Sequence, residues 1–156
     1  MLKEAARLAR LEYLPDHRQP PTARVVAAAL VAVAASLVAD AIVVAIGEVV
    51  FPATKGYGHF RFADYARLTV IGVIIAAVSW PIVTRLTWAP RWAYLRLAVI
   101  VSIVLWLPDV YLLDRGQPTQ AVAVLMVMHV AIALAAYNVI VRMAPVGPTQ
   151  HRALDT

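Results

Sequence analysis

The feature that most constrains the fold of this chain is a long apolar run between Val25 and Ile46. The run contains two polar side chains, Ser36 and Asp40. A helix of about 20 apolar residues crosses the hydrocarbon core of a bilayer, and this run is long enough to do so. A charged side chain at that depth is expensive, so it is usually paired or placed beside water. The sequence therefore predicts a membrane-spanning helix that carries a carboxylate, Asp40, in its interior.

Three further apolar segments follow, so we expect an all-α fold, an integral membrane four-helix bundle. The composition agrees, because 62% of the 156 residues are hydrophobic and 15% are charged, whereas soluble domains are about half apolar and a quarter charged. The first apolar run exceeds the roughly 7–15 residues of a signal-peptide core, so we expect it to be retained. The predicted transmembrane domain covers residues 24–143, with spans at about residues 24–50, 65–86, 92–113 and 119–142.

Basic residues are distributed unequally between the two sides of this predicted bundle. Four spans place both ends of the chain on one side, which holds Lys3, Arg7, Arg10, Arg18, Arg24, Arg85, Arg91, Arg96, Arg142 and Arg152. The other side holds Lys55, Arg61, Arg67 and Arg115. Because Lys and Arg are enriched in cytoplasmic loops, we expect cytoplasmic N- and C-termini and a multi-pass protein of the cell (plasma) membrane. The same loops account for the net charge of +5, so we expect no nucleic-acid partner.

The predicted cytoplasmic segments flank the spans. In residues 1–23, a short N-terminal amphipathic helix with Lys3, Arg7 and Arg10 on one stripe precedes a Pro-rich linker. Such a basic stripe can hold a helix on an anionic membrane surface. A solvated arm that touches no lipid is the alternative. Residues 144–156 are polar and rich in Pro and Gly, so we expect a disordered cytoplasmic tail.

Catalytic chemistry has little support in the sequence. The chain has no cysteine, which excludes disulfides and thiolate sites, and it contains no Gly-rich phosphate loop, HExxH or GxSxG motif. We therefore expect no enzyme activity, no cofactor and no metal site. Pro108 and Asp109 close the apolar core of the third span. We expect Asp109 and Asp114 to form interfacial ion pairs with Arg61 and Arg115.

The loop between the first two spans is unusually aromatic. Its candidate interaction residues are Tyr57, His59, Phe60, Arg61 and Phe62. Aromatic residues commonly anchor the ends of spans at the membrane–water interface. The alternative is a recognition surface on the outer face for an extracytoplasmic partner.

Asp40 and His129 form the predicted intramembrane polar pair. Each lies ten residues from the outer end of its span, at Val50 and Thr119 respectively, which is a depth of about 15 Å at 1.5 Å per residue. We therefore hypothesise that the first and fourth helices touch and that Asp40 faces His129, with Ser36 one turn away on the same face. The pair is either a static contact between helices or a titratable pair, because histidine changes its charge near neutral pH.

Three short segments carry a resemblance to known proteins: LVADAIV in the first span, SIVLWLPDV in the third and VLMVMHVAIALAAYNVI in the fourth. Over about residues 24–142, the chain resembles a family of small actinobacterial, mycobacterial-type, four-span membrane proteins of unknown function. The high Ala, Val and Arg content is also typical of GC-rich actinobacteria. The resemblance implies four helices in the plasma membrane, and it implies no activity and no site residues.

Two functions are compatible with these features. The first is a non-enzymatic integral plasma-membrane protein that serves as an accessory or interaction partner of another envelope or membrane protein. Its partners would be the lipid bilayer and a protein, and it could form a homo-oligomer. The second is a small transporter or proton-responsive channel that uses the intramembrane Asp40 and His129.

Overall fold

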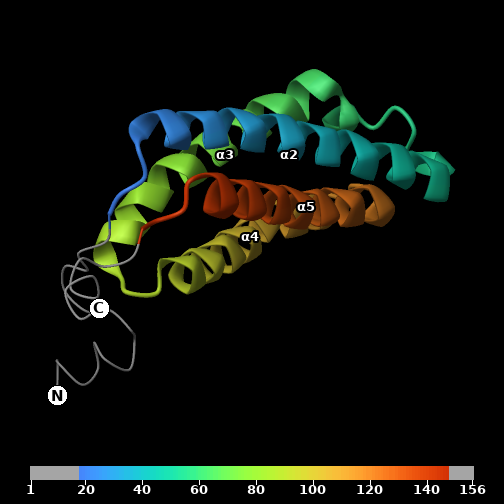
Figure 1. Cartoon of the computed structure of the whole chain (residues 1–156). Helices are drawn as coiled ribbons and strands as arrows, with labels where there is room; N and C mark the ends of the chain where they lie inside the picture. Colours follow the sequence, from blue (N-terminus) through green and yellow to red (C-terminus); the bar gives the residue numbers. More distant parts are fainter. Residues whose placement is uncertain (1–17, 148–156) are drawn as a thin grey trace, which may run out of the picture.

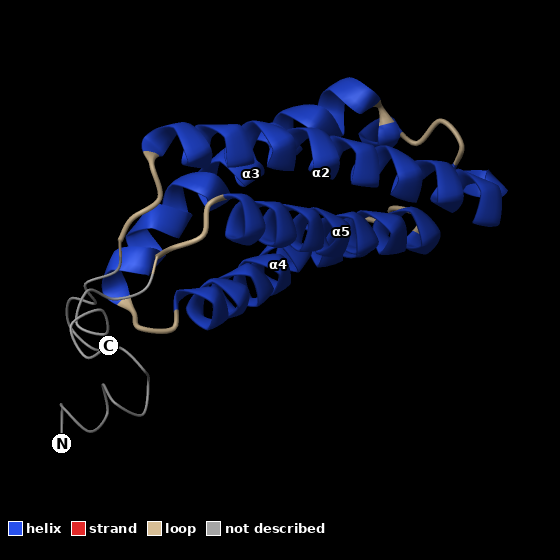
Figure 2. Ribbon diagram, in the orientation of Figure 1, coloured by secondary structure: helices blue, strands red, loops and turns tan. Residues whose placement is uncertain are grey.

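The computed structural model describes residues 18–147, and these residues form four long helices joined by short connections (Figure 1). The helices are α2 (Thr22–Val50), α3 (Phe62–Leu86), α4 (Pro90–Asp114) and α5 (Thr119–Met143). Two short 3₁₀ helices, η1 (Pro52–Thr54) and η2 (Gly58–Phe60), lie in the loop between α2 and α3. No strand occurs in residues 18–147 (Figure 2). All four helices are long and apolar enough to cross a membrane, which confirms the predicted all-helical class.

Proline marks the start of three helices and also occurs inside two. Pro21 and Pro118 precede α2 and α5, and Pro90 is the first residue of α4, where its missing N–H costs no helical hydrogen bond. Pro81 and Pro108 lie inside α3 and α4, and both helices continue past them. Membrane helices tolerate such prolines because neighbouring groups satisfy the freed carbonyls. As a result α4 continues to Asp114.

The helices are arranged in the order α3–α2–α5–α4 by their contacts, with the most extensive contact between α2 and α5. The buried stripe of α2 is made of small and polar residues at helical spacing: Ala28, Ala32, Ser36, Asp40, Val44 and Gly47. Small residues let the backbones of two helices approach closely. At Gly47 an added Cβ would lie 2.8 Å from a Val124 methyl carbon. The stripe therefore positions Asp40 on the side of α2 that faces the rest of the bundle.

Aromatic side chains and backbone bonds hold one end of the bundle together. The buried Trp80 ring donates from Nε1 to the Ala144 carbonyl at 2.8 Å, and the Tyr94 hydroxyl donates to the Ala76 carbonyl at 2.9 Å. The Gly147 N–H donates to the Arg18 carbonyl at 3.0 Å, so the two ends of the described segment meet. The expected arm with Lys3, Arg7 and Arg10 lies outside the described residues, as do residues 148–156 of the expected tail.

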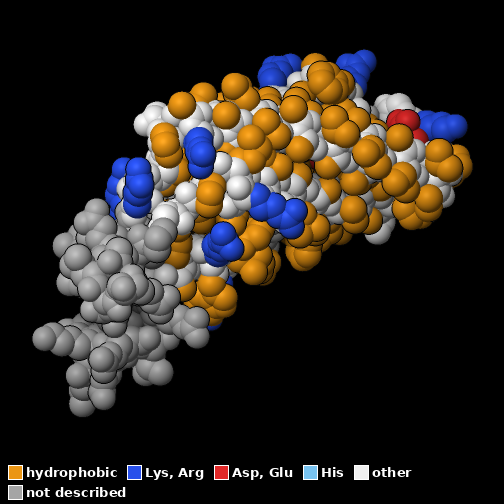
Figure 3. Space-filling view, in the orientation of Figure 1, with side chains coloured by type: hydrophobic (Ala, Val, Ile, Leu, Met, Phe, Trp, Pro, Cys, Tyr) orange, Lys and Arg blue, Asp and Glu red, His pale blue; other side chains and the backbone are white. Residues whose placement is uncertain are grey.

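Exposed large hydrophobic side chains occur along all four long helices. Hydrophobic side chains cover most of the face shown in Figure 3. Helix α4 is the least buried of the four, and its buried residues are Pro90, Tyr94 and Asp109. Two of these lie near its start, whereas Asp109 lies near its end. Asp109 is therefore the buried residue in the second half of α4.

Candidate functional site

A layer of polar side chains crosses the bundle, with one member from each helix. We call Thr69 of α3, Asp40 of α2, His129 of α5 and Asp109 of α4 the polar layer. Asp40 is 0% exposed, and Thr69 and Asp109 are also buried. His129 is partly buried, with 25% of its side chain exposed. Their order across the bundle follows the packing order of the helices, since α2 contacts both α3 and α5, and α4 contacts α5.

The first half of the polar layer joins α2 to α3. Thr69 Oγ1 donates a hydrogen bond of 2.6 Å to Asp40 Oδ2. Asp40 Oδ1 and Ser36 Oγ are both buried, and neither has a hydrogen-bond partner among the described residues. The Tyr65 ring of α3 lies close enough to Asp40 for an electrostatic interaction. A fully buried carboxylate here has one good hydrogen bond, which is sparse for a group that is costly to desolvate.

The second half of the polar layer joins α4 to α5. His129 Nδ1 lies 3.1 Å from Asp109 Oδ2 and 3.0 Å from the Leu125 carbonyl oxygen. A proton on Nδ1 would lie between these two acceptors, and Asp109 Oδ2 has no hydrogen bond of good geometry among the described residues. The contact is an ion pair when His129 is charged. Trp106 Nε1, which donates to the Met126 carbonyl at 3.1 Å, adds a second link between α4 and α5.

The polar layer is connected electrostatically to the loop between α2 and α3. Burial, followed by the charge of Asp109, raises the pKa of the Tyr57 phenol. The Tyr57 hydroxyl is itself buried without a hydrogen-bond partner among the described residues. His59 of the same loop interacts with Asp109 through space. Titratable groups thus extend from the loop to the interior of the bundle.

The residues expected to form the intramembrane pair lie in the polar layer, but their nearest polar partners are different residues. Helices α2 and α5 are in contact, and Asp40 interacts electrostatically with His129. Asp40 accepts a hydrogen bond from Thr69, and His129 Nδ1 lies next to the Asp109 carboxylate. Asp109, which we expected to form an interfacial ion pair with arginine, is instead buried against His129. Sequence reasoning missed both Thr69 and this role of Asp109.

The five loop residues predicted to bind a partner divide into two groups. Phe60 is buried and Tyr57 is partly buried, and their rings meet edge to face at 5.2 Å. His59, Arg61 and Phe62 are exposed. The buried pair holds the loop, so the exposed group alone is available to a partner.

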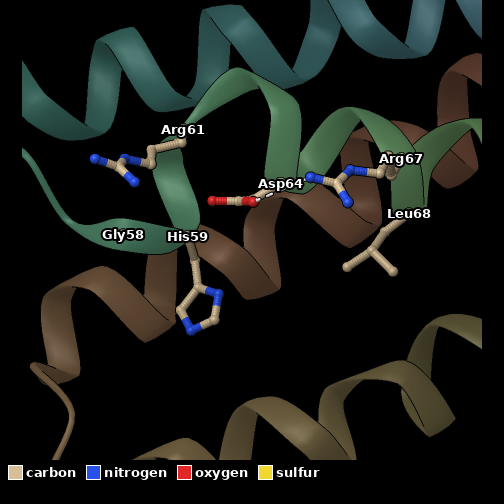
Figure 4. A pocket seen from close by; sticks show the side chains of 6 residues that line it. All are labelled: Gly58, His59, Arg61, Asp64, Arg67 and Leu68. Carbon is tan, nitrogen blue, oxygen red and sulfur yellow. Dashed lines mark ion pairs between the residues drawn. The ribbon is translucent and has the colours of Figure 1, made fainter.

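A shallow, open hollow of about 530 Å³ lies beside the exposed group. We call it the loop hollow, and it is lined by Gly58, His59, Arg61, Asp64, Arg67 and Leu68 (Figure 4). Arg67 Nη2 lies 3.9 Å from Asp64 Oδ1. Two arginines and one carboxylate give the hollow a positive balance.

The described residues contain no group of three His, Cys, Asp or Glu side chains that could hold a metal ion. The arrangement of the polar layer suits binding or transfer of a proton or another cation between carboxylate and imidazole groups. Comparisons with protein-family models, with curated proteins and with solved structures found no match.

Proposed function

We propose that this chain is a non-enzymatic integral protein of the plasma membrane that binds another membrane or envelope protein through the loop hollow. The observation that carries the proposal is the exposed, positively charged hollow at one end of an otherwise lipid-like surface. Arginine and aromatic residues are the side chains that most often dominate binding energy at protein interfaces. Here Arg61 and Arg67 line the hollow, and Phe62, which follows Arg61 in the sequence, is 61% exposed. An acidic segment of the partner fits this chemistry.

The loop that carries the hollow is ordered before any partner binds. The Thr54 hydroxyl donates to the Phe51 carbonyl at 2.8 Å, and the Phe62 and Tyr65 rings pack edge to face at 5.4 Å. Phe60 is buried in the cluster that contains Val44 and Ala121. An ordered loop loses less conformational entropy on binding than a mobile one does. This supports a recognition role beyond anchoring at the interface.

The test is recovery of the partner with a variant of the hollow. We expect Arg61→Ser with Arg67→Ser to reduce recovery of a stoichiometric partner about tenfold or more, since each lost charged contact costs about 1 kcal/mol or more. The measurement is quantitative mass spectrometry after cross-linking in native membranes and purification. Lys55→Ser with Arg115→Ser is the matched control, because it removes the same charge from exposed positions outside the hollow. Equal recovery with both double variants would contradict the proposal.

We propose that both termini are cytoplasmic, so that the loop hollow lies outside the cell. The loop charge asymmetry supports this orientation, and the contact between Arg18 and Gly147 supports a common side for the two ends. Reporter fusions after Gly116 and after Gly147 should therefore report opposite sides of the membrane, with the second cytoplasmic. The same side at both positions would contradict four spans, and the reverse assignment would place the hollow in the cytoplasm.

A second candidate function is a small transporter or proton-responsive channel. The observation that favours it is the contact between Asp109 and His129, together with buried Asp40 on the neighbouring helix α2. Ionisable residues inside a membrane bundle commonly mark proton or ion pathways. The loop residues Tyr57 and His59 extend the same set of groups towards the aqueous side.

A further inference from the structure

The three serines of the chain provide an internal comparison. Ser79 Oγ donates to the Ala76 carbonyl at 2.7 Å, and Ser102 Oγ donates to the Ala98 carbonyl at 2.8 Å. This bond to the preceding helical turn is the usual way for a serine to satisfy its hydroxyl inside an apolar helix. Ser36 is 0% exposed, and its hydroxyl has no hydrogen-bond partner among the described residues. Its hydroxyl is therefore available for another group in the interior.

The unsatisfied oxygen of Asp40 lies one helical turn from Ser36. Both side chains belong to the buried stripe of α2, so they share one face of the helix. Asp40 Oδ1 has no partner among the described residues, whereas Oδ2 accepts the hydrogen bond from Thr69. Two unpartnered, fully buried oxygens therefore belong to adjacent turns of the buried stripe of α2. Leaving both without a partner would cost free energy, since each has lost its contact with water.

The charge of Asp40 must also be balanced. The titratable groups that face it are Tyr65 from α3 and His129 from α5, and His129 is already paired with Asp109. The ion pairs of the described residues do not include a Lys or Arg at Asp40. A single carboxylate in apolar surroundings is neutralised by one positive charge. Hard cations prefer oxygen ligands such as carboxylates.

We propose that Ser36, Asp40 and Thr69 form a binding site for a monovalent cation, either a proton or Na⁺, between α2 and α3. A proton on Asp40 Oδ1 removes the charge of the carboxylate and makes the unpartnered oxygen a donor. A sodium ion takes the carboxylate and the two hydroxyl oxygens as ligands. The site lies on the opposite side of α2–α5 from Asp109, and the inference rests neither on partner binding nor on proton flux.

The experiment measures the thermal unfolding midpoint of the purified full chain in lipid nanodiscs while Na⁺ replaces choline at constant ionic strength. For a Na⁺ site, we expect the midpoint to rise with Na⁺ and to saturate. The half-saturating concentration should increase up to about tenfold for each unit that the pH falls, because protons compete for the same oxygen. For a proton site, the midpoint should depend on pH and not on Na⁺.

Three variants identify the site. Asp40→Asn should abolish whichever dependence the wild type shows. Ser36→Ala should weaken it about tenfold, the effect of one lost hydrogen bond or ligand oxygen. Ser102→Ala is the matched control, because its hydroxyl is satisfied by its own helix, and it should behave as the wild type.

Two results would overturn the proposal. One is a wild-type midpoint that responds to neither Na⁺ nor pH, which would indicate a static contact or a bridging water. The other is a Na⁺ or pH response that Asp40→Asn leaves unchanged, since another group would then carry it. If Asp40→Asn does not fold, the comparison of Ser36→Ala with Ser102→Ala decides, and equal responses would reject the site.

Discussion

Replacing Trp80 with alanine should lower the free energy of unfolding by about 3 kcal/mol, the low end of the range for a buried aromatic residue. Trp80 is the largest fully buried side chain of the described residues. Its ring packs against Tyr94 at 5.0 Å, and its Nε1 holds the Ala144 carbonyl after the end of α5. The loss of unfolding free energy is expected at the low end of that range because lipid is as apolar as the interior of the bundle. The loss therefore comes from the cavity, the contacts and the hydrogen bond.

The measurement is reversible unfolding in mixed micelles with increasing SDS. Trp80→Phe keeps much of the ring and removes the hydrogen bond, so we expect about 1 kcal/mol from the bond and a smaller packing loss. Ile75→Ala is the matched control on the same helix, since the Ile75 side chain is 64% exposed, and it should change stability little. If Trp80→Ala were no more destabilising than Ile75→Ala, the contact between Trp80 and Ala144 would not stabilise the bundle.

The helices could be predicted from the sequence because length and apolarity are properties of a continuous segment. The first and fourth spans were expected at residues 24–50 and 119–142, and the structure has Thr22–Val50 and Thr119–Met143. The second span begins at Phe62, three residues before the expected 65. The arginine and aromatic residues there obscured the start, because helix ends are determined by local backbone geometry more than by apolarity.

The partners within the polar layer could not be predicted in the same way. Counting residues from the ends of two spans gives depth in the membrane, and Asp40 and His129 do interact through space. Depth does not fix the rotation of each helix about its axis or the order of neighbours around the bundle. Those depend on how the small-residue stripe of α2 fits α5. The result is that Asp40 bonds to Thr69 of a third helix.

Two signals in the sequence point to the missed partners. Thr69 belongs to a stripe of α3 at helical spacing, whose buried residues are Tyr65, Thr69, Val73, Ala77, Trp80 and Thr84. A threonine in such a stripe predicts a buried hydroxyl. Asp109 was assigned to the interface because Pro108 and Asp109 close the uninterrupted apolar core of the third span. In a membrane bundle the helix can continue, which carries the next residue into the interior.

The contact between Asp109 and His129 should show strong coupling in a double-mutant cycle. We expect His129→Leu to destabilise the bundle by about 3 kcal/mol, because removal of one partner leaves a buried carboxylate uncompensated. Asp109→Leu should cost less, since the His129 ring can still donate to the Leu125 carbonyl. The double variant, with leucine at both positions, should be close to the wild type, because apolar residues often replace a buried pair without loss. Additive losses in the same SDS unfolding assay would show that the two side chains do not act together.

The double variant also separates the two candidate functions, because it removes both ionisable groups from a bundle that is expected to stay folded. A proton-responsive channel or transporter requires these groups. Wild-type proteoliposomes should then move protons, measured with an internal pH-sensitive dye, and those with the double variant should not. A protein that acts by binding a partner needs the two side chains only to attach the second half of α4 to α5. Asp109 is the buried residue in that half of α4. In that case neither the wild-type nor the double-variant proteoliposomes move protons. The double variant still binds its partner, because the loop hollow is unchanged. Proton movement that persists in the double variant would exclude the pair from any pathway and leave Asp40 as the ionisable group to test.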